Sequence, residues 1–270
     1  MPNLYDAHNH FHDERLAQVR DSALIELRRQ GLRRMVVNGS CEQDWPAVVD
    51  LAKSCPEVIP SFGYHPWYLK ERSAEWQQNL AGFVDQVPCG IGEIGLDKWI
   101  KDYDLEDQER VFVCQMELAA ERNLPVSIHC LQAWGRLLEL LRDLPRPQCG
   151  FLLHSFGGPR EMILPLAKLG AYFSLPGYFA HARKTRQQEA FRHVPRDRLL
   201  IETDAPDQTL PTDRGRYPLI DSQTGKPLNH PANLRAVYEF AAELRREPIE
   251  DLAGQVEQNF HRLFGLFSPR

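Results

Sequence analysis

Residues 125–154 read PVSIHCLQAWGRLLELLRDLPRPQCGFLLH and contain the unit from which the fold can be inferred. The short apolar run Pro125–His129 predicts a strand, and the leucine spacing in Ala133–Asp143 predicts a helix. A second apolar run, Gly150–His154, predicts the next strand. Strand, helix and strand in succession are typical of a parallel sheet that is covered by its connecting helices.

The same alternation extends in both directions from this unit. Eight strands are predicted, most of them followed by a helix: Leu4–Ala7, Arg34–Asn38, Val58–Gly63, Gly90–Ile94, Pro125–His129, Gly150–His154, Ala171–Leu175 and Arg198–Thr203. The repeat count predicts one α/β domain over residues 1–270, a (β/α)₈ TIM barrel. A doubly wound open sheet is the alternative, but no G-x-G-x-x-G follows the first strand.

One segment interrupts the alternation of strands and helices. Pro206–Pro231 is rich in proline, glycine and polar residues, and it separates the eighth strand from the last two helices, expected at Ala232–Arg245 and Ile249–Phe264. Loops of this length within a compact domain are commonly functional. We expect this segment to lie over the mouth of the barrel.

Composition narrows the class of protein. Hydrophobic residues make up 43% of the chain and charged residues 26%, as in soluble globular proteins. A net charge of -5 provides no global basic field for nucleic acids, although a metal site can supply positive charge locally. No apolar stretch has the length of a membrane-spanning helix, and the N-terminus lacks a signal-peptide pattern. We expect no membrane association and infer no obligate protein partner.

Cysteine usage indicates a reducing compartment. None of the six cysteines forms a C-x-x-C pair, and several lie in apolar runs. These cysteines are Cys41, Cys55, Cys89, Cys114, Cys130 and Cys149. Buried free thiols, and therefore a cytoplasmic enzyme, are the expectation.

Histidines and acidic residues recur where the predicted strands end. Near the first strand, His8 and His10 lie on one face with Asp6 below them, because alternate residues of a strand share a face. Other strand ends supply further candidates: His65, Glu93, His129, His154, Glu202 and Asp204. In a barrel these ends converge on one rim, so the set predicts a divalent-metal site there.

The simpler interpretation is that each histidine is a hydrogen-bonded structural residue. It explains any one of them alone, but burying so many imidazoles without a ligand leaves polar groups unsatisfied. Glu93 in an apolar strand is costly to bury unless it is paired or coordinated. The set as a whole therefore favours metal ligation.

Several of these segments together resemble the TatD family of metal-dependent deoxyribonucleases, within the amidohydrolase-like barrels. The resembling motifs are Asp6-Ala7-His8-Asn9-His10-Phe11, Gly63-Tyr64-His65-Pro66, Gly92-Glu93-Ile94-Gly95-Leu96-Asp97, Pro125-Val126-Ser127-Ile128-His129, His154-Ser155-Phe156-Gly157-Gly158, Glu202-Thr203-Asp204-Ala205-Pro206 and Asn229-His230-Pro231. They occur in the family's order between Asp6 and about Phe264.

The resemblance implies two divalent ions, of zinc, manganese or magnesium. The first would be held by His8, His10, Glu93 and Asp204. Glu93 would bridge to the second, held also by His129 and His154, and His65 would orient phosphate or handle protons beside them. The substrate implied is DNA or another phosphodiester.

We hypothesise hydrolysis by a metal-activated water, with Asp204 orienting the water and accepting its proton. Glu202 shares the strand parity of Asp204 and could support a ligand histidine; alternatively, it is an interior charge paired with a basic side chain. Glu93, His65 and Asp204 are thus the expected catalytic residues.

Substrate contacts are less clearly marked. Relatives often carry an arginine soon after the fifth-strand histidine, whereas this chain has none there and offers Trp134 as a stacking surface. Tyr64, Trp67, Tyr68 and Trp99 follow the third and fourth strands and could stack on bases, or could simply pack under loops.

Two rival functions remain open on sequence alone. A metal hydrolase acting on a small carbonyl or aminoacyl ester could use the same site. Many amidohydrolase relatives bridge their metals with a modified lysine, and Glu93 in that place favours the nuclease. A non-catalytic barrel used for binding is the second rival, and the intact ligand set argues against it.

Overall fold

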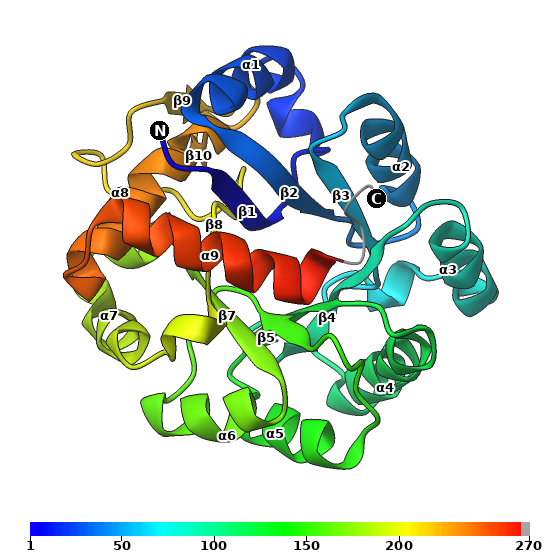
Figure 1. Cartoon of the computed structure of the whole chain (residues 1–270). Coiled ribbons are helices and arrows are strands. Elements are labelled where there is room, and N and C mark those ends of the chain that lie inside the picture. The colour runs from blue at the N-terminus through cyan, green and yellow to red at the C-terminus, as the bar shows by residue number, and fades with distance from the viewer. Residues whose placement is uncertain (266–270) are drawn as a thin grey trace.

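Eight parallel strands stand in chain order in the computed structural model, which describes residues 1–265. Figure 1 shows helices surrounding the ring of strands. The strands are β1 (Leu4–Asn9), β2 (Leu32–Asn38), β3 (Val58–Phe62), β4 (Gly90–Asp97), β5 (Val126–Leu131), β6 (Phe151–Leu153), β7 (Ala171–Pro176) and β8 (Leu199–Glu202). The predicted TIM barrel is confirmed; the last five residues of the expected domain, 266–270, lie outside the described residues.

Helices connect the strands on the outside of the barrel. They are α1 (Arg20–Gln30), α2 (Trp45–Ser54), α3 (Trp76–Val84), α4 (Leu105–Arg122), α5 (Trp134–Asp143), α6 (Ile163–Lys168), α7 (Thr185–Arg192), α8 (Leu234–Arg245) and α9 (Ile249–Phe264). Capping residues fix both ends of α4: the Asp104 carboxylate accepts from the backbone N–H of Asp107, and Asn123 ends the helix at a φ of 50°.

Side chains help to close the barrel between its first and last strands. Within residues 1–265, no ladder pairs β8 with β1. Two backbone bonds join the chain at the mouth, from His10 N to Ala205 O (2.8 Å) and from Asp204 N to His8 O (3.0 Å). Deeper in this seam, the Asp6 carboxylate accepts from the backbone N–H and the hydroxyl of Thr203. The residues around His8, His10 and Asp204 are therefore held in register.

A tyrosine hydroxyl completes the seam towards the other end. Tyr238, from α8, is fully buried, and its hydroxyl accepts from Tyr5 N and donates to Tyr5 O, both at 2.9 Å. These are the backbone groups that a paired strand would otherwise satisfy. One side chain thus replaces a missing step of the β1–β8 ladder.

The last helix closes the end of the barrel at which the strands begin. Figure 1 shows α9 lying across that end. Asn259 of α9 donates from its amide to Arg196 O and to Leu199 O, where β8 begins, and Phe260 packs on Tyr5 of β1 with ring centroids 4.7 Å apart. An active site is therefore expected at the opposite end of the barrel, where the strands end.

Only part of the segment 206–231 lies at the mouth of the barrel. The expectation that the whole segment covers the mouth is therefore wrong. Its strands β9 (Pro218–Ile220) and β10 (Pro227–Asn229) form an antiparallel hairpin, which Figure 1 shows beside α1. The Tyr217 hydroxyl fixes the hairpin there by donating to Glu26 of α1 at 2.7 Å. Only residues 206–209 and Pro227 line the mouth cavity.

Two further expectations can be compared with the structure. None of the helices in residues 1–265 combines the length and the apolar character needed to cross a bilayer. All six cysteines are free thiols, as expected.

We predict that Tyr238→Phe lowers the free energy of unfolding by about 2–4 kcal/mol, because it leaves the Tyr5 N–H and C=O buried without a partner. Urea unfolding measures the change. Tyr103→Phe, at a site 41% exposed, is the matched control and should stay within about 0.5 kcal/mol of the parent protein. Equal stability of both variants would contradict this account of the seam.

Candidate metal centre

The residues predicted to bind metal lie together where the strands finish. His8 lies in β1, Glu93 in β4 and His129 in β5. His10 and His154 directly follow β1 and β6, and Asp204 follows β8 after Thr203. All but His10 are buried, and His65 joins them from the turn after β3. Convergence on one rim, as predicted from the sequence, is observed.

Glu93 lies at the centre of five imidazoles. Its Oε2 atom is 3.3 Å from His8 Nε2 and 3.2 Å from His10 Nε2. Its Oε1 atom faces the other three, which are His65 Nε2 (3.3 Å), His129 Nδ1 (3.1 Å) and His154 Nε2 (2.8 Å). The two oxygens of a single carboxylate thus address two separate groups of nitrogen donors.

Glycines let the strand that carries Glu93 approach its neighbour. Gly95 has a φ of 155°, and a Cβ atom there would come 2.0 Å from His129 O in β5. Gly92 has a φ of 156°, and its Cβ would come 2.8 Å from the Ser127 side chain. Side chains are excluded at both positions, so β4 and β5 pack closely around Glu93.

The Asp204 carboxylate completes the first group of donors. Its Oδ1 atom is 3.5 Å from His8 Nε2 and 3.7 Å from His10 Nε2. Its Oδ2 atom accepts from the side-chain amide of Gln208 at 2.6 Å. The imidazoles of His8 and His10 therefore face carboxylates of both Glu93 and Asp204.

The charges in the cavity are strongly coupled. Burial by itself raises the pKa of Glu93, but the imidazoles of His154, His65 and His8 outweigh it and hold the pKa well below its usual range. Burial also opposes a proton on His10, yet Glu93 and Asp204 raise its pKa to about 9. Burial of Asp204 raises its own pKa to about 7. The carboxylates thus draw positive charge into the cavity.

Outer hydrogen bonds fix which ring nitrogen faces the cavity. His10 Nδ1 must donate to the Asn38 carbonyl (2.8 Å), and His129 Nε2 must donate to the Asp97 carboxylate (3.0 Å), because these oxygens only accept. In the neutral rings, which is the form that binds a metal, the lone pairs of His10 Nε2 and His129 Nδ1 are therefore directed towards Glu93. His8 Nδ1 lies 2.7 Å from Ser127 Oγ, a hydroxyl that both donates and accepts, so this contact does not fix the tautomer of His8.

His65 has the opposite orientation. Its Nδ1 accepts from the backbone N–H of Trp67 at 3.2 Å, so the proton of the neutral ring is on Nε2, which points at Glu93. Burial lowers the pKa of His65 to about 4, which keeps the ring neutral. His65 thus presents an N–H to the cavity where its neighbours present lone pairs.

These residues fit divalent cations. His8 Nε2 is buried without a hydrogen-bond partner while two carboxylate oxygens face it, an arrangement that a shared cation would satisfy. His8, His10 and Asp204 place one ligand atom each within 4.8 Å of one another. Imidazole with carboxylate suits Zn²⁺ or Mn²⁺.

Glu202 faces the ligand histidine His154 and forms its hydrogen bonds with two serines. It is fully buried and accepts from Ser155 N (2.8 Å), Ser155 Oγ (2.5 Å) and the Ser174 hydroxyl. His154 Nδ1 lies 3.8 Å away, beyond hydrogen-bonding distance. Glu202 therefore anchors the chain that follows His154, and no Lys or Arg in residues 1–265 pairs with it.

Asp97 is a functional candidate that the sequence reasoning missed. It is fully buried, and its Oδ2 atom receives both His129 Nε2 (3.0 Å) and the indole N–H of Trp67 (2.6 Å). Its Oδ1 atom accepts from Trp99 N at 2.6 Å. The available signal was its place four residues after Glu93, on the same face of the strand.

The environments differ among three of the aromatic substrate candidates, Tyr64, Trp67 and Trp134. Trp67 is 48% exposed and lines the mouth. Tyr64 is 1% exposed, and its hydroxyl donates to Glu42 at 2.8 Å, so its ring is not available for stacking. Trp134 packs on Phe156 with ring centroids 4.7 Å apart and is not among the residues that line the mouth. Of these three, only Trp67 is open to the mouth.

Two adjoining hollows of about 610 and 600 Å³ form the mouth. One contains the metal centre, and the other extends from it towards α7. They share six lining residues: Trp67, His129, Leu131, His154, Asp207 and Gln208.

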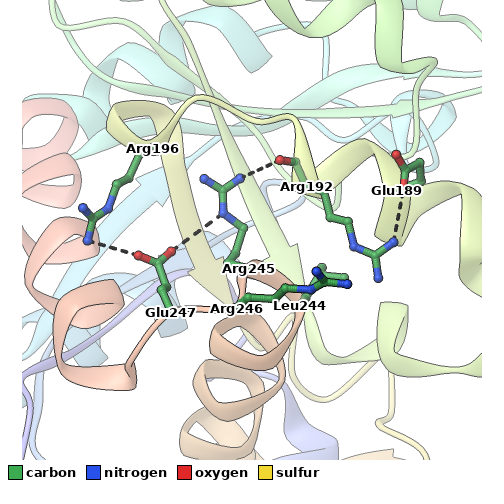
Figure 2. A pocket seen from close by; sticks show the side chains of 7 residues that line it. All are labelled: Glu189, Arg192, Arg196, Leu244, Arg245, Arg246 and Glu247. Carbon is green, nitrogen blue, oxygen red and sulfur yellow. Dashed lines mark hydrogen bonds and ion pairs between the residues drawn. The ribbon is translucent and has the colours of Figure 1, made fainter.

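A third hollow, of about 630 Å³, lies at the opposite end of the barrel, where Arg196 directly precedes β8 (Figure 2). Figure 2 shows Glu247 between Arg196 and Arg245, with distances of 3.0 and 3.8 Å. Arg192 pairs with Glu189 at 3.0 Å. Internal ion pairs engage these arginines, so this hollow is not the candidate site.

Comparisons with known proteins agree with this geometry. The sequence profile described as TatD related DNase matches residues 5–265. A "3'-5' ssDNA/RNA exonuclease TatD" from Erwinia tasmaniensis is 31% identical over 268 residues, covering 97% of this chain and 100% of the relative. The Escherichia coli protein YcfH, an "uncharacterized metal-dependent hydrolase", is 32% identical over 222 residues, covering 82% of this chain and 79% of the relative.

A solved structure shares the fold. The crystal structure of YjjV, a TatD homologue from Escherichia coli, superposes with a TM-score of 0.86 at 26% sequence identity. The alignment covers 98% of each chain.

We predict that Asp97→Asn weakens Mn²⁺ binding about 10–100-fold, because the amide no longer fixes His129 with its Nδ1 lone pair towards the cavity. Calorimetric titration with Mn²⁺ measures the affinity. Asp50→Asn, on the exposed outer side of α2, is the matched control and should bind as the parent does. Parental affinity in Asp97→Asn would show that Asp97 does not orient His129.

Proposed function

Because the chain belongs to the family of TatD-related DNases and is a metal-dependent hydrolase of the nuclease type, we propose that it cleaves DNA phosphodiester bonds at a binuclear metal site. The observation that carries the proposal is the buried Glu93 carboxylate, each oxygen of which faces its own group of imidazole nitrogens. A cytoplasmic location, where the free cysteines would stay reduced, is part of the proposal.

The ligands divide along the two oxygens of Glu93. His8, His10 and Asp204 would hold one ion with Oε2. His129 and His154 would hold the other with Oε1. When bound there, divalent ions lower the pKa of a water molecule and withdraw charge from the phosphoryl oxygens.

Asp204 is positioned to take a proton. Its Oδ2 atom is held by the Gln208 amide, which leaves Oδ1 facing the cavity. We assign Asp204 Oδ1 to orienting the attacking water and accepting its proton.

His65 is suited to hold the substrate. Its neutral ring directs the Nε2 proton into the cavity, because Nδ1 accepts from Trp67 N. Such an N–H can donate to a phosphoryl oxygen and so orient the phosphate. This tautomer supports the phosphate-orienting role inferred for His65, because the nitrogen that faces the cavity carries a proton where a ligand needs a lone pair.

The two rival functions are not favoured. The relatives are named as nucleases and metal-dependent hydrolases, which supports a phosphodiester substrate above a small carbonyl ester. A scaffold without catalysis would have no use for the inward lone pairs of His10 and His129.

We expect the manganese-loaded protein to release nucleotides from single-stranded DNA, and EDTA to stop the release. Asp204→Asn should lower kcat at least about 100-fold, because the proton acceptor is lost. Asp213→Asn, an exposed position in the loop after β8, is the matched control and should keep parental turnover.

A carboxyl ester, p-nitrophenyl acetate, is assayed in parallel. Turnover of the ester with none of DNA would contradict the nuclease function. Parental DNA turnover in Asp204→Asn would contradict the role given to this carboxylate.

A further inference from the structure

The hollow at the end of the barrel opposite the metal centre, here called the basic hollow, carries an excess of positive charge (Figure 2). Its volume of about 630 Å³ is typical of small-molecule sites. Besides Leu244, four arginines and two glutamates line it: Arg192, Arg196, Arg245, Arg246, Glu189 and Glu247. Four positive and two negative groups leave a formal charge of +2, on a chain whose net charge is -5. The basic hollow therefore attracts anions.

Arg246 supplies a cation that the fold itself does not use. It ends α8 in the left-handed conformation, with a φ of 57°. Glycine or asparagine is usual at such a position, because a larger side chain is strained there. Within residues 1–265, the guanidinium of Arg246 has no hydrogen bond, ion pair or ring contact. A strained position that carries an unpaired cation favours a role for this side chain in binding.

Arg192 can turn to a ligand without leaving its carboxylate unpaired. Glu189 has three basic neighbours, at 2.9 Å (His193), 3.0 Å (Arg192) and 3.9 Å (Arg160). The side chains of Glu189 and Arg192 are 49% and 47% exposed, and ion pairs at such exposed positions contribute little to stability. Glu189 keeps two basic partners when Arg192 moves into the basic hollow.

Glu247 is shared in a similar way between Arg196 (3.0 Å) and Arg245 (3.8 Å). Arg245 is fixed, because it donates to Phe191 O and to Val194 O, both at 2.8 Å, where α7 ends. These hydrogen bonds also offset the partial negative charge of that helix end, which by itself would repel an anion. The side chain of Arg196 is 53% exposed, and Glu247 keeps Arg245 when Arg196 turns to a ligand.

We propose that the basic hollow binds the diphosphate group of a small molecule, through the guanidinium groups of Arg192, Arg196 and Arg246. Each guanidinium can donate two parallel hydrogen bonds to phosphate oxygens. None of the described residues that line the hollow is aromatic, so a base attached to the diphosphate has no surface on which to stack. Free pyrophosphate and a nucleoside diphosphate should therefore bind alike.

The three arginines come from separate segments of the chain. Arg192 ends α7, Arg196 precedes β8, and Arg246 lies between α8 and α9. A diphosphate that bridges them binds only the folded protein and therefore stabilises it. The proposal is independent of the nuclease function, because the basic hollow shares no lining residue with the hollow that contains the metal centre.

Calorimetric titration of the whole chain with pyrophosphate and with ADP tests the proposal. The protein is titrated as purified and again after treatment with EDTA and dialysis, because metal ions at Glu93 would also attract phosphate groups. Binding at the basic hollow should persist after the EDTA treatment. Pyrophosphate and ADP should then have similar affinities.

Arg246→Gln should weaken the binding of both ligands about tenfold, because one charge-assisted partner of the phosphates is lost. Arg192→Gln should have a similar effect. Pyrophosphate should also raise the Tm of the parent protein more than that of Arg246→Gln. Arg142→Gln, which removes an exposed arginine from the last turn of α5, is the matched control and should bind as the parent does.

Three results would overturn the proposal: no binding of millimolar pyrophosphate to the EDTA-treated parent protein, binding by Arg246→Gln within twofold of the parent, or an equal loss in Arg142→Gln. The last of these would show that binding depends only on overall charge. Binding of ADP without binding of pyrophosphate would also contradict it, because the base and sugar would then be the groups recognised.

Discussion

The buried carboxylate of Glu93 is the constraint around which this protein is organised. A carboxylate that is 3% exposed is stable only when positive charge is close to it. Five imidazole nitrogens lie within 3.3 Å, and in their neutral form the rings of His10 and His129 direct lone pairs towards it because their other nitrogens donate outwards. Such an arrangement satisfies its own electrostatics when cations lie between the carboxylate and the rings.

Local features of β1, β4 and β8 position the side chains that surround Glu93. Gly92 and Gly95 allow β4 to pack against β5 without side chains between them. The β8–β1 seam depends on the Asp6 carboxylate and on the Tyr238 hydroxyl. These contacts hold the ends of β1 and β8 together, where His8, His10 and Asp204 meet. The same few contacts therefore stabilise the barrel and position the metal-binding side chains.

Sequence periodicity and strand-end chemistry were enough to predict the barrel and the gathering of its histidines, because each signal is local. His65 shows where this reasoning stops: its position was predicted, but its tautomer depends on the Trp67 backbone. Asp97 was missed because its partners are remote in sequence: His129 comes from β5, and Trp67 comes from the turn after β3. The hairpin of residues 218–229 packs on α1 through Tyr217, a contact between segments remote in sequence.

Anomalous X-ray diffraction from crystals grown with Mn²⁺ tests the metal centre most directly. We expect two anomalous peaks on opposite sides of the Glu93 carboxylate. One should lie near His8 and His10, and the other near His129 and His154. Each peak should lie within coordination distance of its nitrogen and oxygen ligands. A manganese-soaked crystal with no peak in this cavity, and with Glu93 still among the five imidazoles, would contradict this expectation.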